Sequence, residues 1–229
     1  MRYFSITNLI FALIASSTFF FACKTQQQVI TTAPKVATTQ DVSILYQDIA
    51  RGENIKLENM VYYLDEPLLI SGRNNFIFDG GGASLVMRNK NEDVMILEYS
   101  NNVTLKNFKA THIEPDGPIG CTGSVLQVRD NDGVLIEKCE LNGSGIIGVT
   151  SYNTKNLKVV DNYIYNNSEY GVLFDTDSTV EITGNKFEDN GKSGQEHVVK
   201  ALNAYLSEVE KIGDGTIQAG IKVSGNTFK

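Results

Sequence analysis

The stretch "VEITGNKFEDN" (residues 180–190) alternates apolar and polar residues, breaks at Gly184-Asn185 and then resumes the same alternation. A near copy, "LKVVDNYIYNN", lies 23 residues earlier, at 157–167. Alternation with a period of two, broken by Gly, Asn or Asp, is typical of short strands joined by tight turns. The chain therefore repeats a unit made of a strand, an asparagine and a second strand.

Further copies extend the repeat in both directions. They are "VTLKNFKA" from Val103, "VLIEKCEL" from Val134 and "IKVSGNTF" from Ile221, and "FIFDGGGASL" from Phe76 is a more divergent one. The basic period is near 23 residues, with longer loops inserted in two coils. A unit this short cannot bury its own apolar face, so it must stack on its copies. The pattern predicts an all-β fold, a right-handed single-stranded parallel β-helix with coils about 4.8 Å apart.

The repeated asparagine has a structural explanation. The fifth residue after each strand start is, in turn, Phe108, Cys139, Asn162, Asn185 and Asn226. We expect the three asparagines to adopt the left-handed conformation at a corner and to form a ladder of side-chain hydrogen bonds. Two positions further on, we expect an inward stack of Ala110, Leu141, Ile164, Phe187 and Phe228.

The first 40 residues predict export. Residues 1–22 combine Arg2 with an apolar run ending at Ala22, which is the layout of a signal peptide. Because Cys23 follows directly, the segment resembles a bacterial lipoprotein signal, in which this cysteine carries the lipid. An ordinary secretory signal and an uncleaved anchor are the alternatives. We expect a protein lipid-anchored to a bacterial membrane, on its periplasmic or cell-surface side.

Residues 23–40 are rich in Gln and Thr and predict a flexible tether, which leaves 41–229 as the β-helix domain. Two helices are expected in that domain. "ILYQDIARG" (44–52) predicts a short N-terminal capping helix. "SGQEHVVKALNAYLSEVEKIG" (193–213) predicts an amphipathic helix inserted near the C-terminus, with a Ser193–Glu196 capping box. This helix, or a second subunit in a homo-oligomer, would cover the open C-terminal coil.

Charge and cysteine content narrow the function further. The net charge is −7 and no run of Lys and Arg occurs, which excludes a nucleic-acid partner. Cys121 and Cys139 could form a disulfide in an exported protein. The repeat places Cys139 facing inward, however, which favours a buried thiol.

The units "GIIGVTSYNTKNLKVVDNYIYNN" (145–167) and "GVLFDTDSTVEITGNKFEDN" (171–190) resemble the parallel β-helix repeats of the pectate-lyase superfamily. The resemblance covers residues 41–229. It implies a substrate groove along the sheet that precedes the asparagine corner. This fold carries lyases, hydrolases, adhesins and inert spacers, so the resemblance does not fix the function.

The strands of that sheet should be "VMILEY", "SVLQVRD", "GIIGVT" and "GVLFDTD". If Leu97, Val128, Val149 and Phe174 face inward, the residues that follow them form one solvent-facing row. That row, Glu98, Arg129, Thr150 and Asp175, predicts a sugar-binding strip. Alternating charges on an ordinary exposed sheet are the other explanation.

Two neighbouring segments could add ligands to the strip. The insertion "ATHIEPDGPIGCTG" (110–123) would bring His112 and Asp116 beside Arg129. The turns "RDND" and "DTDS" could together bind Ca²⁺, although Asp is also a common turn residue. The candidate ligands are Asp130, Asp132, Asp175 and Asp177.

Three functions remain on this evidence. The first is polysaccharide binding without catalysis, and the second is a lyase for a uronate-containing glycan, with Arg129 as base or charge neutraliser. The third is a structural or adhesion module. A glycoside hydrolase is excluded because Glu98 and Asp175 would lie three rungs, about 14 Å, apart.

Overall fold

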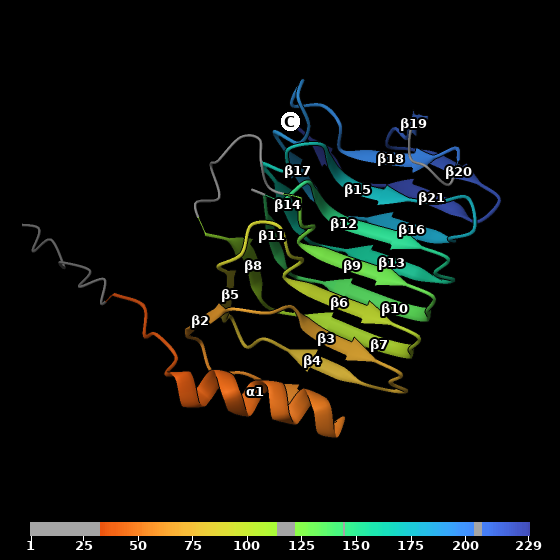
Figure 1. Ribbon diagram of the computed structural model, residues 1–229. Coiled ribbons are helices and arrows are strands. Elements are labelled where there is room, and N and C mark those ends of the chain that lie inside the picture. The colour runs from red at the N-terminus through yellow and green to blue at the C-terminus, as the bar shows by residue number, and fades with distance from the viewer. Residues whose placement is uncertain (1–32, 114–121, 144, 204–207) are drawn as a thin grey trace, which may run out of the picture. The chain divides into compact units, whose positions relative to one another are not determined.

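The computed structural model describes residues 33–113, 122–143, 145–203 and 208–229. Residues Pro34–Lys229 form one compact unit of stacked coils (Figure 1). Each coil passes through three sheets in turn, and within each sheet successive coils pair in parallel. The predicted β-helix is therefore confirmed.

Sheet 1 has the order β19-β18-β15-β12-β9-β6-β3. Its strands are β3 (Leu68–Ser71), β6 (Met95–Glu98), β9 (Leu126–Arg129), β12 (Ile147–Tyr152), β15 (Tyr170–Phe174), β18 (Val198–Ala201) and β19 (Val209–Lys211).

Sheet 2 has the order β1-β4-β7-β10-β13-β16-β21-β20. Its strands are β1 (Ile55–Lys56), β4 (Ile77–Asp79), β7 (Asn101–Lys106), β10 (Asp132–Glu137), β13 (Leu157–Val160), β16 (Val180–Thr183), β20 (Thr216–Gln218) and β21 (Ile221–Ser224).

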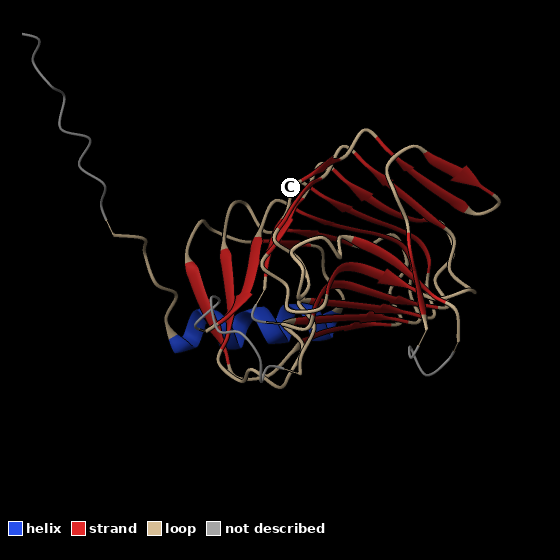
Figure 2. Ribbon diagram, turned by 90° about the horizontal axis from the view of Figure 1, so that it is seen from above, coloured by secondary structure: helices blue, strands red, loops and turns tan. Residues whose placement is uncertain are grey.

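Sheet 3 has the order β2-β5-β8-β11-β14-β17-β22. Its strands are β2 (Val61–Leu64), β5 (Ser84–Met87), β8 (Lys109–His112), β11 (Glu140–Asn142), β14 (Tyr163–Tyr165), β17 (Lys186–Glu188) and β22 (Thr227–Phe228). Seen from above, the three sheets enclose the core (Figure 2).

The core consists of stacks of like residues, one per coil. The predicted stack in sheet 3 is confirmed, because Leu141 pairs with Ala110 and Ile164, and Phe187 pairs with Ile164 and Phe228. The rings of Phe187 and Phe228 meet edge to face, with centroids 5.3 Å apart. Such stacks bury nearly all of each apolar side chain, which is the main source of stability in the fold.

The asparagine ladder joins sheet 2 to sheet 3. The Oδ1 of Asn185 accepts from the backbone N–H of Asn162 at 2.9 Å, and the Oδ1 of Asn226 accepts from that of Asn185 at 2.9 Å. The predicted ladder is confirmed, but the predicted left-handed conformation of the asparagines is wrong. The residue before each of them adopts it: Asp161, Gly184 and Gly225 have φ of 54°, 70° and 69°.

The two other corners also carry polar ladders, which the sequence reasoning missed. Between sheets 3 and 1, Asn167 donates from Nδ2 to the Oδ1 of Asn190 at 2.7 Å. Between sheets 1 and 2, the Oδ1 of Asn131 accepts from the N–H of Ser100 at 2.9 Å. These side chains satisfy backbone groups that the bends leave without strand partners.

Helix α1 (Thr39–Arg51) covers the first coil, as predicted (Figure 1). Thr38 and Asp41 form a capping box at its start, and Gly52 ends it in the left-handed conformation. Leu45 and Ile49 insert into the core. The amphipathic spacing of α1 therefore closes the N-terminal end of the stack.

The second predicted helix is wrong. Within 193–213, the described residues contain β18 and β19, which pair antiparallel. Val198 pairs with Val172 of β15, so the stacking register of sheet 1 overrides the helical spacing of apolar residues. The adjacent β-branched residues Val198 and Val199 also favour a strand.

The last coil has its own closing elements. Sheet 1 ends in antiparallel β19 and sheet 2 in antiparallel β20. Asp214 takes the place of the next asparagine, since its Oδ1 accepts from the N–H and the Nδ2 of Asn226, both at 2.9 Å. In the described part of the chain, no helix is long and apolar enough to cross a membrane.

Candidate functional site

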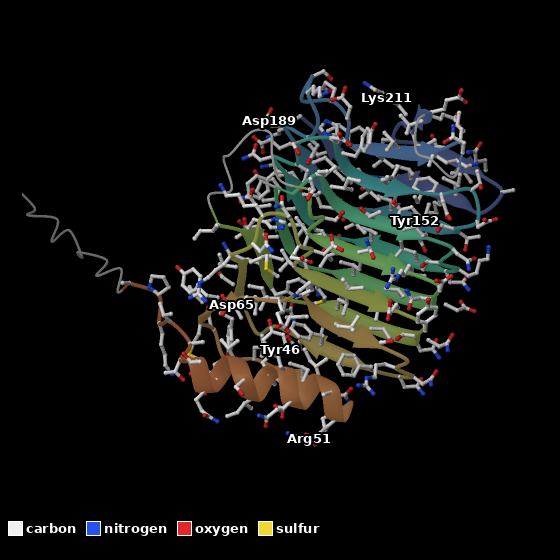
Figure 3. All side chains as sticks on the ribbon, viewed as in Figure 1. Tyr46, Arg51, Asp65, Tyr152, Asp189 and Lys211 are labelled. Atoms are coloured by element: carbon white, nitrogen blue, oxygen red, sulfur yellow. The ribbon has the colours of Figure 1, made fainter. Side chains whose placement is uncertain are left out.

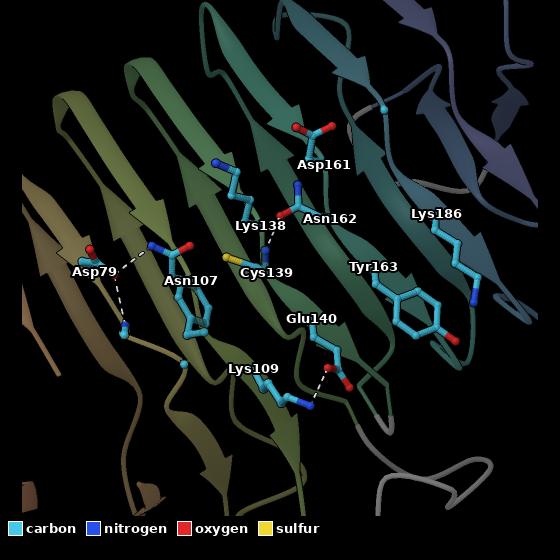
Figure 4. A pocket seen from close by; sticks show the side chains of 14 residues that line it. Asp79, Asn107, Lys109, Lys138, Cys139, Glu140, Asp161, Asn162, Tyr163 and Lys186 are labelled. Carbon is cyan, nitrogen blue, oxygen red and sulfur yellow. Dashed lines mark hydrogen bonds and ion pairs between the residues drawn. The ribbon is translucent and has the colours of Figure 1, made fainter. Parts of the chain in front are cut away.

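A groove runs along the outside of the asparagine corner, parallel to the stacking axis (Figure 4). We call it the corner groove; its volume is about 840 Å³. It extends from the coil of Gly81 to the coil of Lys186, four steps of about 4.8 Å, or about 19 Å. Its lining is Asp79, Gly81, Gly82, Asn107, Phe108, Lys109, Lys138, Cys139, Glu140, Asp161, Asn162, Tyr163, Gly184 and Lys186.

The corner geometry produces this groove directly. The residue before the ladder position and the residue after it both point outward, while the ladder residue between them is buried and forms the floor. One wall is Asn107, Lys138 and Asp161, all in the left-handed conformation. The opposite wall is the row Lys109, Glu140, Tyr163 and Lys186, which pair in register on successive strands of sheet 3.

Hydrogen bonds and ion pairs hold the sheet 3 wall in place. Lys109 Nζ lies 2.6 Å from Glu140 Oε2, and Tyr165 donates its hydroxyl to Glu140 Oε1 at 2.8 Å. In β17, two coils beyond Glu140, Lys186 Nζ lies 2.5 Å from Glu188 Oε2, which also accepts from the hydroxyl of Tyr163 at 2.9 Å. Side chains held in this way lose little conformational freedom when a ligand binds.

The tyrosine rings add rigidity to the same wall. Tyr163 and Tyr165 stack with centroids 4.1 Å apart, and Lys186 Nζ lies 4.0 Å from the centre of the Tyr163 ring. Stacked aromatic pairs and cation–π contacts both favour a fixed arrangement of the side chains that form them.

Two carboxyl groups of the groove, those of Glu140 and Asp79, are hydrogen-bond acceptors. Burial opposes ionisation of Glu140, but the bonds from Lys109 and Tyr165 outweigh it and lower the pKa of its carboxyl. The hydrogen bond from Asn107 lowers the pKa of Asp79. Neither group is therefore suited to donate a proton in general acid catalysis.

The predicted strip on sheet 1 is only partly assembled. Glu98 pairs in register with Arg129, and the Nε of Arg129 donates to Glu98 Oε2 at 2.7 Å. Glu98 is 8% exposed, so it faces solvent much less than predicted. Its hydrogen bond raises the pKa of the Arg129 guanidinium, which makes Arg129 a poorer proton acceptor than a free arginine.

Thr150 does not belong to this row. Arg129 pairs with Tyr152, two residues further along β12. Tyr152 is labelled in Figure 3. Thr150 is 2% exposed, and its hydroxyl lies 2.9 Å from that of Ser124. The prediction failed because it aligned Val149 with Val128, whereas Val149 pairs with Leu126.

Asp175 comes directly after β15, and its carboxylate accepts hydrogen bonds from backbone groups of nearby turns. Its Oδ1 accepts from the N–H of Ser178 at 2.9 Å and its Oδ2 from the N–H of Asn153 at 3.0 Å. This is the turn chemistry for which Asp is commonly used.

The insertion residues do not support the strip as predicted. His112 belongs to β8 and is fully buried, with Nε2 2.8 Å from the carbonyl oxygen of Glu92. Burial lowers the pKa of its imidazole. His112 therefore does not join Arg129 on the solvent-facing strip, because it lies in sheet 3 and Arg129 lies in sheet 1. Asp116 lies outside the described residues, as do Cys23 and Cys121.

The four aspartates expected to bind Ca²⁺ do not form a ligand cluster. Asp130 accepts from Asn153 Nδ2 and Asp132 from Asn156 Nδ2, both at 2.7 Å. Across the described ranges, no group of three or more His, Cys, Asp or Glu residues could hold a metal ion. The carboxylates of Asp130, Asp132 and Asp175 accept hydrogen bonds from asparagines in neighbouring coils instead.

Cys139 lies at the floor of the corner groove, with 3% of its surface exposed. Burial raises the pKa of its thiol to about 12. It is a free cysteine, in agreement with the buried thiol that the repeat predicts.

The sequence does contain the signal for the corner groove. Its walls are the residues immediately before and after each ladder position, and they recur with the same 23-residue period. What the sequence did not reveal is that the left-handed corner opens a groove rather than a convex edge.

A family model described as "Right handed beta helix region" matches residues 48–228. No curated protein and no solved structure matches the chain. The matched range contains every strand of the three sheets. The chain therefore belongs to the right-handed β-helix family.

Proposed function

We propose that this protein binds polysaccharide and that the corner groove is its binding surface. The observation that carries the proposal is the groove itself, about 840 Å³ in volume, with walls fixed by ion pairs and tyrosine hydroxyls. This volume lies in the range of ligand sites in proteins.

The lining favours a hydroxyl-rich ligand. The sheet 3 wall offers both donors and acceptors on successive coils, in the order Lys109, Glu140, Tyr163 and Lys186. A sugar hydroxyl both donates and accepts, so a glycan can satisfy each of these groups in turn. The strands at the corner are paired on both sides, from β7 to β16 in sheet 2 and from β8 to β17 in sheet 3, which leaves no free edge for an added peptide strand.

Binding without catalysis is the favoured form of this function. The shifted carboxyls of the groove are acceptors, and Arg129 on sheet 1 is tied to Glu98. The resemblance to pectate-lyase repeats, which implies glycan substrates, also supports a glycan ligand. A lyase would release products with ultraviolet absorbance, and we expect none.

Export and lipidation at Cys23 complete the proposal. Their support is the layout of residues 1–23, a positive start and an apolar run ending before a cysteine. An anchored protein should be recovered in the membrane fraction, and Cys23→Ser should release it. Equal membrane recovery of both forms would contradict lipid anchoring at this residue.

The function is tested by co-sedimentation with insoluble polysaccharides and by titration with soluble ones. We expect Tyr163→Ala to weaken binding roughly tenfold, because it removes the aromatic side chain of the sheet 3 wall. Tyr99→Asn is the matched control. It removes a tyrosine that is 60% exposed outside the groove lining, and Asn tolerates its φ of 51°. Equal losses in both variants, or no binding by the wild-type protein, would contradict the proposal.

A further inference from the structure

We infer that the corner groove selects an uncharged polysaccharide rather than a uronate-containing or sulfated one. This inference rests on the proposed function and specifies the ligand class. It differs from the acidic substrate that the family resemblance implies.

The charges of the lining balance. The charged lining residues are three lysines, Lys109, Lys138 and Lys186, and three acids, Asp79, Glu140 and Asp161. Binding of a polyanion relies on a surplus of Lys and Arg to displace its counterions. This groove has no surplus, and the whole chain is at −7.

Most of these charges are already paired within the protein. Glu140 neutralises Lys109 at 2.6 Å, Glu188 neutralises Lys186 at 2.5 Å, and Asp79 lies 3.7 Å from Lys106. A ligand carboxylate would have to displace one of these acids or lie next to it. Either arrangement costs free energy, whereas a hydroxyl can bond to the pair without breaking it.

Lys138 is the lining cation that forms no ion pair with any described residue. Its neighbour in the same wall, one coil further, is Asp161. A ligand carboxylate approaching Lys138 would therefore be repelled by a carboxylate about one strand spacing, 4.8 Å, away. A polycation would meet the same obstacle from Lys138 when it approaches Asp161.

The corner itself provides matched variants. Lys138 and Asp161 occupy equivalent positions with φ of 53° and 54°, so this backbone accepts either side chain. Asp161→Lys shifts the charge of the lining from zero to +2, and Lys138→Asp shifts it to −2. Both substitutions keep an exposed residue that the fold already uses at this position.

The experiment measures binding of the full chain to a neutral β-glucan, to polygalacturonate and to chitosan, at 50 and 500 mM NaCl. We expect the wild-type protein to bind the β-glucan with less than about a twofold change between the two salt concentrations. Asp161→Lys should gain at least about tenfold in affinity for polygalacturonate at low salt and lose this gain at high salt. Lys138→Asp should gain affinity for chitosan instead.

Preferential binding of polygalacturonate by the wild-type protein would overturn the inference and leave the proposed function standing. So would a steep salt dependence of wild-type binding. Absence of binding to all three polymers would overturn the proposed function itself, and the inference with it.

Discussion

Replacement of Asn185 by Ala should destabilise the protein strongly. Asn185 is 1% exposed, and its Oδ1 accepts from both the backbone N–H and the Nδ2 of Asn162. Its own Nδ2 donates to the Val159 carbonyl at 2.8 Å and to Asn226 Oδ1 at 3.0 Å. The substitution thus breaks the ladder at its centre.

The magnitude follows from these bonds. A buried donor left unpaired, here the N–H of Asn162, costs about 1–3 kcal/mol, and each of the two lost amide donations costs about 1 kcal/mol net. We therefore expect the free energy of unfolding to fall by about 4 kcal/mol. Because a domain of this size loses about 2–4 °C per kcal/mol, the melting temperature should fall by roughly 12 °C.

Urea unfolding followed by circular dichroism measures this change. Asn101→Ala is the control, because Asn101 is exposed and, among the described residues, its side chain makes one hydrogen bond, from Nδ2 to Asn74 Oδ1 at 3.0 Å. We expect less than about 0.5 kcal/mol for the control. A loss below about 1 kcal/mol for Asn185→Ala would refute the view that the ladder supports the corner.

Three further predictions concern other buried or capping groups. Asp214→Ala should lower the free energy of unfolding by about 1 kcal/mol. Hydrogen bonds from Asn226 lower the pKa of the Asp214 carboxyl. The contribution of Asp214 to stability is therefore present above the pKa of the unfolded carboxyl and is lost as the pH falls through the pKa of the folded one. If the wild-type protein and Asp214→Asn lose stability equally between pH 5 and pH 3, this account of Asp214 is wrong. Burial lowers the pKa of His112, so below about pH 6.5 the unfolded chain binds the proton more readily than the folded one and stability falls. In His112→Gln the urea midpoint should therefore fall less between pH 7.5 and pH 5.5 than it does in the wild-type protein. An equal fall in both proteins would contradict this prediction. Because the pKa of its thiol is raised to about 12, Cys139 should resist alkylation at pH 8 in the native protein and react in urea. Mass spectrometry measures the labelling of this cysteine. Rapid labelling of Cys139 in the native protein would argue against a closed groove floor.

The repeat explains why the fold could be predicted from the sequence. The strand pattern recurs with a basic period of 23 residues, lengthened where a loop is inserted, and each unit needs its neighbours to bury its apolar face. The ladder between sheets 3 and 1 was equally visible, since Asn167 and Asn190 end the repeated stretches 157–167 and 180–190. The C-terminal helix was mispredicted because local periodicity cannot register the pairing of Val198 with Val172.

The candidate site was harder to predict, for geometric reasons. The prediction placed Thr150 beside Arg129, but the register of β12 differs by two residues and places Tyr152 there. The sequence alone does not fix this register. Burial of His112 and pairing of Arg129 with Glu98 depend on the packing of neighbouring coils. The corner groove depends on the bend of the left-handed residues, which only the structure reveals.

The most direct test of the account is to map where a bound oligosaccharide changes the amide signals of the protein by NMR. The account predicts perturbations confined to the corner groove, at residues such as Lys138, Glu140, Asp161 and Tyr163. Perturbations centred on Arg129 and Tyr152 of sheet 1, with the groove signals unchanged, would contradict it.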